Sequence, residues 1–264
     1  MMEKIKTENK RIWELDFLRG FLIFAMIIYH LFYFFYRYIY LQDWEFISRT
    51  SEIYIFAEWC MKFLYYSPFF EGLKFLGWQL FFIISGISST LSKSNVKRAV
   101  NIGIFVCAMV IANLLCSVFI RYAVIVGYGV FFIYFYCMLL FELIRKKSIK
   151  VHIIVVAVLA VVTVLVMVFI PDLSASPLEW FGLSKKLKLY NDNLYLFPMF
   201  FSFFVGGLLG KLFYEKKKQS LLPNFFIKNE KMFAFIGRHS MKFYIGHIIL
   251  LPLIFITIAV IFNP

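Results

Sequence analysis

Charged residues are scarce in this chain of 264 residues, and long hydrophobic stretches separate them. Asp, Glu, Lys and Arg make up 16% of the sequence, whereas a typical soluble domain has about 25%. Hydrophobic residues make up 62%, and 35 residues are Phe. This composition excludes an ordinary soluble domain and predicts a protein embedded in a membrane.

Cysteine and histidine are also rare, with four residues of each type. The cysteines lie mostly inside apolar stretches, and no two of them form a CxxC pair: they are Cys60, Cys107, Cys116 and Cys137. This spacing argues against a disulfide framework and against a zinc site. We therefore expect no metal and interpret the cysteines as small core residues.

Acidic residues are too few to balance the basic ones, which gives a formal net charge of +13. In a soluble chain such an excess would suggest nucleic-acid binding. Here the Lys and Arg residues lie in short segments between apolar stretches, where they set membrane orientation and contact lipid headgroups. We expect lipids, not nucleic acid, as their partners. Residues 1–16 are charged and the stretch after them is long, which predicts an uncleaved anchor and not a signal peptide.

Seven apolar stretches are predicted to cross the membrane as helices, which takes about 20 residues each. They lie at 17–41, 73–92, 99–120, 123–144, 151–170, 194–214 and 240–262. Their basic flanks predict a cytoplasmic amino terminus and an external carboxyl terminus. We see no internal repeat, and we expect residues 1–264 to form one all-α polytopic bundle in the cytoplasmic membrane.

The longer connections carry the polar residues that remain. Residues 42–72 are predicted to be an external loop with an interfacial helix near 51–66. Residues 171–193 are predicted to be a second external loop, and the basic segment 216–238 a cytoplasmic loop. The glycines within 206–210 are predicted to allow close helix packing in the sixth span.

The first span contains two ionisable residues, Arg19 near its start and His30 in its middle. They are eleven positions apart, which is three turns plus about 20°, so both point the same way about 16 Å apart. An ionisable group at this depth costs roughly 2.5–3.5 kcal/mol and usually faces a protein interior or a water-filled cavity. The alternatives are a structural hydrogen bond for His30 and snorkelling of Arg19 to the headgroups.

Two other histidines lie in or near predicted spans. His247 is about two turns inside the last span, almost on the same face as Ser240, and is predicted to line a cavity with His30. His152 lies at the boundary of the fifth span, where contact with solvent or headgroups would satisfy it. We therefore expect His247, and not His152, to have a functional role.

Four stretches, taken in order, resemble one known family. They are Glu14–Gly20 (ELDFLRG) with His30, Phe82–Ser88 (FIISGIS), Asp192–Pro198 (DNLYLFP), and Gly237–Ser240 (GRHS) with His247. Their order and spacing resemble the heparan-alpha-glucosaminide N-acetyltransferase catalytic-domain family in its short bacterial form, over about the whole chain. The spacing of Arg19 and His30 is also similar to that in the wider acyltransferase-3 group.

The resemblance implies an integral membrane acetyltransferase. It would move an acetyl group from cytoplasmic acetyl-coenzyme A to a hydroxyl or amino group of a sugar or cell-envelope glycan at the other face. His30 is then the best candidate for the catalytic base or acyl carrier, because neutral imidazole can accept a proton or the acyl group. His247 is predicted to be a second polar partner, and Asp192 an acceptor-binding or acid/base group.

The phosphates of coenzyme A require a basic binding site with small hydrogen-bond donors. Arg19 could hold a phosphate through charge-assisted hydrogen bonds, oriented by Asp16 three residues earlier. The other candidates for contact with the coenzyme are Ser85, Ser88, Ser89, Lys93, Lys97, Arg98, Arg238 and His239. For the basic residues among them, a topological role alone is the alternative.

Two other classes of function stay open from the sequence. Buried His and Arg also line the paths of transporters and channels, although no inverted repeat with broken helices is visible here. A non-catalytic membrane assembly factor would need only the aromatic-rich composition. The sequence also leaves open the acceptor, the choice between O- and N-acylation, and the oligomeric state, for which a homodimer is possible. It does not decide between direct transfer and an acyl-histidine intermediate.

Overall fold

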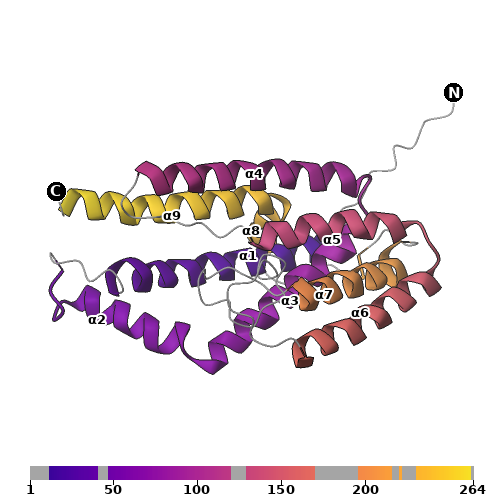
Figure 1. Cartoon of the computed structure of the whole chain (residues 1–264), viewed down its shortest axis with the longest axis horizontal. Helices are drawn as coiled ribbons and strands as arrows, with labels where there is room; N and C mark the ends of the chain where they lie inside the picture. The colour runs from indigo at the N-terminus through magenta and orange to yellow at the C-terminus, as the bar shows by residue number, and fades with distance from the viewer. Residues whose placement is uncertain are drawn as a thin grey trace.

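The computed structural model of the chain describes residues 12–40, 47–119, 129–169, 196–215, 220–221 and 230–262. Every regular element in these ranges is a helix, and none of them contains a β-strand (Figure 1). Helices occupy all seven predicted spans: α1 and η1 (Trp13–Phe34, Phe35–Tyr40), α3 (Pro68–Thr90), α4 (Asn95–Phe119), α5 (Gly129–Arg145), α6 (Ile149–Phe169), α7 and η4 (Leu196–Leu209, Gly210–Tyr214) and α9 (Ser240–Phe262). The all-α prediction is confirmed.

Five helical segments of the described chain are long and apolar enough to cross a membrane. They are Trp13–Tyr40, Pro68–Thr90, Asn95–Ala112, Ile149–Phe169 and Leu196–Tyr214. The other two are shorter: α5 has 17 residues, and α9 contributes the apolar segment Ser240–Phe255. The protein is therefore a helical membrane bundle, while the count of seven spans and the orientation of the termini stay predictions.

Two further helices lie between the spans. The first, α2 (Glu52–Trp59), continues as η2 (Cys60–Tyr65) in the region where an interfacial helix is predicted, and it meets α3 in a V (Figure 1). Its amino terminus is capped by Ser51, whose hydroxyl accepts from the Tyr54 N–H at 3.4 Å. The second, α8 (Glu230–Arg238), lies in the segment predicted to be a loop.

The loop prediction is wrong for residues 230–238 because α8 is amphipathic and packs along α1. Its Phe233 ring lies edge-on to the rings of Phe17, Phe21 and Phe24 on α1, with centroids 5.4–5.7 Å apart. The basic residues of α8 suggested a loop, although they lie beside an apolar side that a helix can bury.

Glycines bring two helix pairs into backbone contact. Between α3 and α7, a methyl group on Gly86 would overlap the Phe203 carbonyl, and one on Gly206 would overlap the Ile83 carbonyl. The same relation joins α1 and α8 through Gly20 and the glycine that precedes Arg238. The predicted role of the 206–210 glycines in packing is confirmed, and α3 packs closely on α7 as α1 does on α8.

The largest apolar core lies among α3, α4, α5, α7 and α9. Phe82, Phe141 and Phe203 are completely buried in it. Cys137 is also buried there, and Cys60 is buried at the start of η2, as predicted for small core residues, whereas Cys107 is exposed on α4. This core fixes the helices that carry the polar groups described next.

Candidate active site

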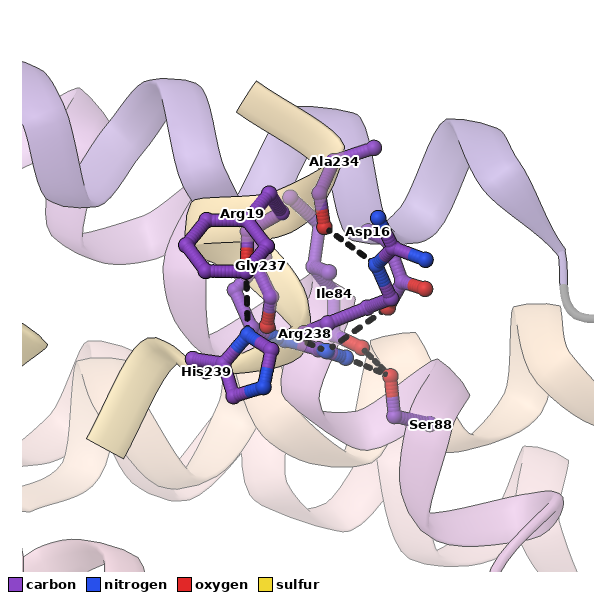
Figure 2. Close-up of polar contacts among 9 residues, drawn as sticks. Asp16, Arg19, Ile84, Ser88, Ala234, Gly237, Arg238 and His239 are labelled. Carbon is purple, nitrogen blue, oxygen red and sulfur yellow. Dashed lines mark hydrogen bonds and ion pairs between the residues drawn. The ribbon is translucent and has the colours of Figure 1, made fainter. Parts of the chain in front are cut away.

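Arg19 joins three helices, α1, α3 and α8 (Figure 2). Its guanidinium donates to Asp16 Oδ1 on α1 at 3.3 Å, to the Gly237 carbonyl at the end of α8 at 3.5 Å, and to Ser88 Oγ on α3. The predicted pairing with Asp16 is present, and both side chains are 17% exposed. A guanidinium has more N–H donors than these three contacts use, so the group can also bind an anion.

Local structure aims Ser88 at Arg19. The Ser88 hydroxyl donates to the Ile84 carbonyl one turn earlier at 2.8 Å, which leaves its oxygen as an acceptor for the guanidinium (Figure 2). On α8, the close approach of Gly237 to α1 brings its carbonyl to Arg19. Packing of the three helices therefore holds the Arg19 side chain in place.

The other predicted serines point elsewhere. Ser89 is fully buried, and its hydroxyl donates to the Ser85 carbonyl at 2.9 Å within α3. Ser85 is 1% exposed, and its hydroxyl has no hydrogen-bond partner among the described residues. Of the three serines, only Ser88 contacts the Arg19 group, while Ser85 offers an unused buried hydroxyl.

More positive charge surrounds Arg19. Arg98 on α4 is near enough to interact electrostatically with Arg19. Arg98 itself forms no ion pair with another described residue. Arg238 is exposed at the end of α8 and donates to the Ala234 carbonyl at 3.2 Å (Figure 2). His239 directly follows α8, and its Nδ1 lies 3.0 Å from the Phe235 carbonyl oxygen of that helix. Arg19, Arg98 and Arg238 thus form a cationic end of the bundle.

A second polar group lies deeper, where α1 meets α9. His30 Nδ1 and His247 Nε2 are 2.8 Å apart, and the two rings stack with centroids 5.0 Å apart. Both side chains are buried, with 7% and 6% exposed. The predicted proximity of these two histidines is present, about 16 Å along α1 from Arg19 at the helical rise per residue.

Hydrogen bonding assigns the protons of the neutral pair. His247 Nδ1 lies 3.2 Å from the Phe243 carbonyl, which can only accept, so His247 Nδ1 carries the proton. His247 Nε2 then accepts from His30 Nδ1, and the lone pair of His30 is on Nε2. His30 Nε2 is therefore the basic nitrogen of the pair.

Lys74 on α3 is a residue that the sequence interpretation missed. Its ammonium nitrogen lies 5.7 Å from the centroid of the Tyr29 ring, and its charge interacts with His30. Lys74 lies near the start of a predicted span, where a cation is readily taken for a topological flank. Its place inside the apolar stretch 73–92 is the signal that could have identified it.

Glu14 was also missed as a buried polar residue, with 3% exposed. Its carboxylate accepts from the Ser220 hydroxyl at 2.5 Å, the Leu221 N–H at 2.8 Å and the Tyr214 hydroxyl at 3.5 Å. These contacts tie residues 220–221 to α1. Glu14 has a structural role in this arrangement, beside the Arg19 group.

Two further predictions concern His152 and Asp192. His152 does not contact solvent as expected: it is 1% exposed, packs on the Phe141 ring and lies 3.1 Å from the Ser148 carbonyl through Nδ1. The Phe141 ring of α5 packs against it at the first turn of α6. Asp192 lies outside the described residues.

Comparison with known proteins gives one match. A sequence model of the family described as "Heparan-alpha-glucosaminide N-acetyltransferase, catalytic" matches residues 11–249. No curated protein matches the chain, and no solved structure does. The matched residues run from the Arg19 group through the His30–His247 pair and cover most of the chain. The chain belongs to the heparan-alpha-glucosaminide N-acetyltransferase catalytic family and is a membrane-bound acyltransferase.

Proposed function

We propose that this enzyme moves an acetyl group from cytoplasmic acetyl-coenzyme A to a hydroxyl or amino group of a sugar or cell-envelope glycan at the other face of the cytoplasmic membrane. The observation that carries the proposal is the buried His30–His247 pair, 2.8 Å apart on two membrane helices. A base of this kind, buried between α1 and α9, can meet both a donor and an acceptor.

His30 is the proposed catalytic residue. In direct transfer, His30 Nε2 takes the proton of the acceptor hydroxyl or amine while the acceptor attacks the thioester carbonyl carbon. The new C–O or C–N bond forms, the C–S bond breaks, and the departing coenzyme A thiolate takes up the proton from His30. In the other route, Nε2 attacks the carbonyl carbon, the C–S bond breaks, and the coenzyme A thiolate leaves an acetyl-imidazole on His30. The acceptor then attacks this acetyl group, its C–O or C–N bond forms as the bond to Nε2 breaks, and its proton passes through His30 to the thiolate.

His247 is the proposed positioning residue. Its Nδ1–H is held by the Phe243 carbonyl, so its Nε2 accepts from His30 and keeps the reactive lone pair of His30 on Nε2. When His30 becomes positively charged, the same hydrogen bond stabilises it. Asp192, from the acidic stretch before α7, is the proposed acceptor-binding or acid/base group.

Arg19 is the proposed anchor for a phosphate of the coenzyme. The planar guanidinium is already oriented by Asp16, Ser88 and the Gly237 carbonyl, and it retains unused donors. Arg98 and Arg238 add positive charge beside it. The Ser85 hydroxyl, which has no hydrogen-bond partner among the described residues, is a candidate for contact with the arm of the coenzyme. The separation of about 16 Å from the histidine pair suits a donor whose charged end and thioester are far apart.

The experiment is to measure acetyl-coenzyme A binding and acetyl transfer with the purified protein in lipid nanodiscs. We expect saturable binding by calorimetry, and transfer of labelled acetyl from the coenzyme to a panel of amino sugars and glycan fragments. Proteoliposomes test the transporter alternative in parallel. Solute flux without any acetyl donor, together with no binding of acetyl-coenzyme A, would contradict the proposal.

A further inference from the structure

Lys74 brings a cation to the level of the histidine pair. It is half-buried on α3, and its ammonium lies over the ring of Tyr29. Tyr29 is the residue that precedes His30 in the chain. A lysine that only snorkels to the headgroups would extend away from the bundle. Here the ammonium turns toward α1, and contact with the π face of Tyr29 holds it there.

The register of α1 and α3 agrees with this placement. Connectivity and the Arg19–Ser88 contact make the two helices antiparallel neighbours at one level. From that level, His30 is about 16 Å along α1 and Lys74 about 21 Å along α3, at the helical rise per residue. The long, flexible stem of Lys74 can cover the remaining difference of about 5 Å, and its ammonium lies over the ring of Tyr29, which precedes His30 on α1.

We propose that Lys74 is a catalytic residue whose ammonium stabilises the oxyanion formed on the acetyl carbonyl during transfer. This proposal rests on the proposed function. When the acceptor attacks the carbonyl carbon, the C=O electron pair moves to the oxygen, and the ammonium of Lys74 donates to that oxygen. The C=O bond then re-forms as the C–S bond breaks, and the acceptor proton passes through His30 to the thiolate.

The chemistry of Lys74 suits this role. An ammonium has several N–H donors, so one can bind a protein acceptor while another binds the substrate oxygen. A charge placed in advance, in a site that excludes water, stabilises a developing oxyanion more than the same charge in water. The pair of histidines supplies proton transfer but no positive charge while both are neutral, so Lys74 completes the set.

The test compares Lys74→Met, which keeps length and loses charge, with Lys74→Arg, which keeps charge. We expect Lys74→Met to lower the transfer rate by about 10²- to 10³-fold, the usual effect of removing one oxyanion donor, with the affinity for acetyl-coenzyme A unchanged. The Lys74→Arg variant should transfer at least tenfold faster than the Lys74→Met variant. The matched control is Lys62→Met, which removes an exposed ammonium that pairs with Glu58 at 2.6 Å, and it should transfer at the wild-type rate.

An oxyanion role also predicts that the defect does not depend on the acceptor. Slow hydrolysis of acetyl-coenzyme A by water should fall by the same factor as transfer, because the same oxyanion forms in both reactions. Lys74→Met transfer within threefold of wild type would overturn the proposal. So would an increase in acceptor KM with hydrolysis unchanged, which would assign Lys74 to acceptor binding.

Two measurements separate this result from failures of other kinds. Wild-type protein without transfer or hydrolysis would contradict the proposed function itself, whatever Lys74 does. Thermal unfolding of each variant in detergent checks folding, and Lys74→Leu, which also lacks a hydrogen-bond donor, replaces the Met variant if the latter does not purify. A Leu variant that transfers within threefold of wild type also overturns the proposal.

Discussion

The Nδ1 atom of His30 and the Nε2 atom of His247 lie within hydrogen-bonding distance, although the residues are 217 positions apart in the chain. The Phe243 carbonyl fixes the proton on His247, and His247 in turn fixes the proton on His30. The backbone thus sets the tautomer of His247, and His247 sets the tautomer of His30. A base prepared in this way needs no rearrangement before it accepts a proton. This geometry is the basis for the first prediction.

Replacing His30 with Ala should abolish chemistry and spare binding. The loss of a positioned acid or base typically lowers the rate by about 10²- to 10⁴-fold, or roughly 3–5.5 kcal/mol of transition-state stabilisation. Acetyl-coenzyme A affinity, measured by calorimetry, should stay near wild type because Arg19 is far from the change. The control is His152→Ala, which removes a buried histidine outside the site and should remain active.

Transfer by His30→Ala within threefold of the wild-type rate would contradict this mechanism. It would also move the catalytic role to His247, whose imidazole lies in the same buried group. Loss of transfer in both histidine variants, with wild-type unfolding temperatures, would agree with a pair that works as one unit.

The histidine pair was within reach of the sequence because both residues are rare and lie inside apolar stretches. An imidazole at that depth needs a partner, and few residues could provide one. The proton assignment was not within reach, since it depends on the Phe243 carbonyl and on the 2.8 Å contact across two helices. Lys74 was missed because a cation near a span's end usually marks topology.

The Arg19 group shows a second limit. Asp16 is three residues away on the same helix, so its contact followed from helical spacing alone. The Gly237 carbonyl is 218 positions away, on a helix that was predicted to be a loop. Ser85, Ser88 and Ser89 lie within little more than one turn of α3, so the sequence alone could not show which of them contacts Arg19. The side of α3 that faces α1 decides this, and it carries Ser88.

Changing Arg19 to Lys should weaken coenzyme binding. Lysine keeps the charge but loses the planar donor group that now reaches Asp16, Ser88 and a carbonyl together. We expect the Kd for acetyl-coenzyme A to rise about tenfold, which corresponds to about 1.4 kcal/mol. The measurement is calorimetry in nanodiscs, with Arg37→Lys at the opposite end of the same helical segment as the control. Wild-type affinity in Arg19→Lys would remove Arg19 from the binding site.

Gly206→Ala should destabilise the bundle without touching either polar group. The added methyl would overlap the Ile83 carbonyl, so α3 and α7 would have to separate. Overpacking of this kind costs about 1–3 kcal/mol. Gly77→Ala is the matched control on α3, because nothing lies within 4 Å of its Cβ position. It should be neutral or slightly stabilising in thermal or SDS unfolding, since Ala favours helix. Equal unfolding temperatures for both variants would contradict the close contact of α3 and α7.

The last prediction concerns which helices cross the membrane, and α5 is the element that decides it. With 17 residues, α5 is at the lower end of the lengths that span a bilayer. If α3, α4 and α5 all cross, the start of α2 and the turn after α5 lie on opposite faces. Basic residues flank that turn and also the turn between α3 and α4, which predicts that both turns are cytoplasmic.

Three single cysteines test this arrangement in a background that lacks the native ones: Glu52→Cys, Lys93→Cys and Lys147→Cys, all at exposed positions. A membrane-impermeant maleimide added to intact cells should label Glu52→Cys, and should label the other two only after permeabilisation. If α5 does not cross while α4 does, Lys147→Cys will be labelled from outside and Lys93→Cys will stay protected. Labelling of all three from one face would contradict the crossing of α3. The pattern thus tests the crossing of α3 by itself and tests α4 and α5 as a pair, because both of these helices lie between Lys93 and Lys147.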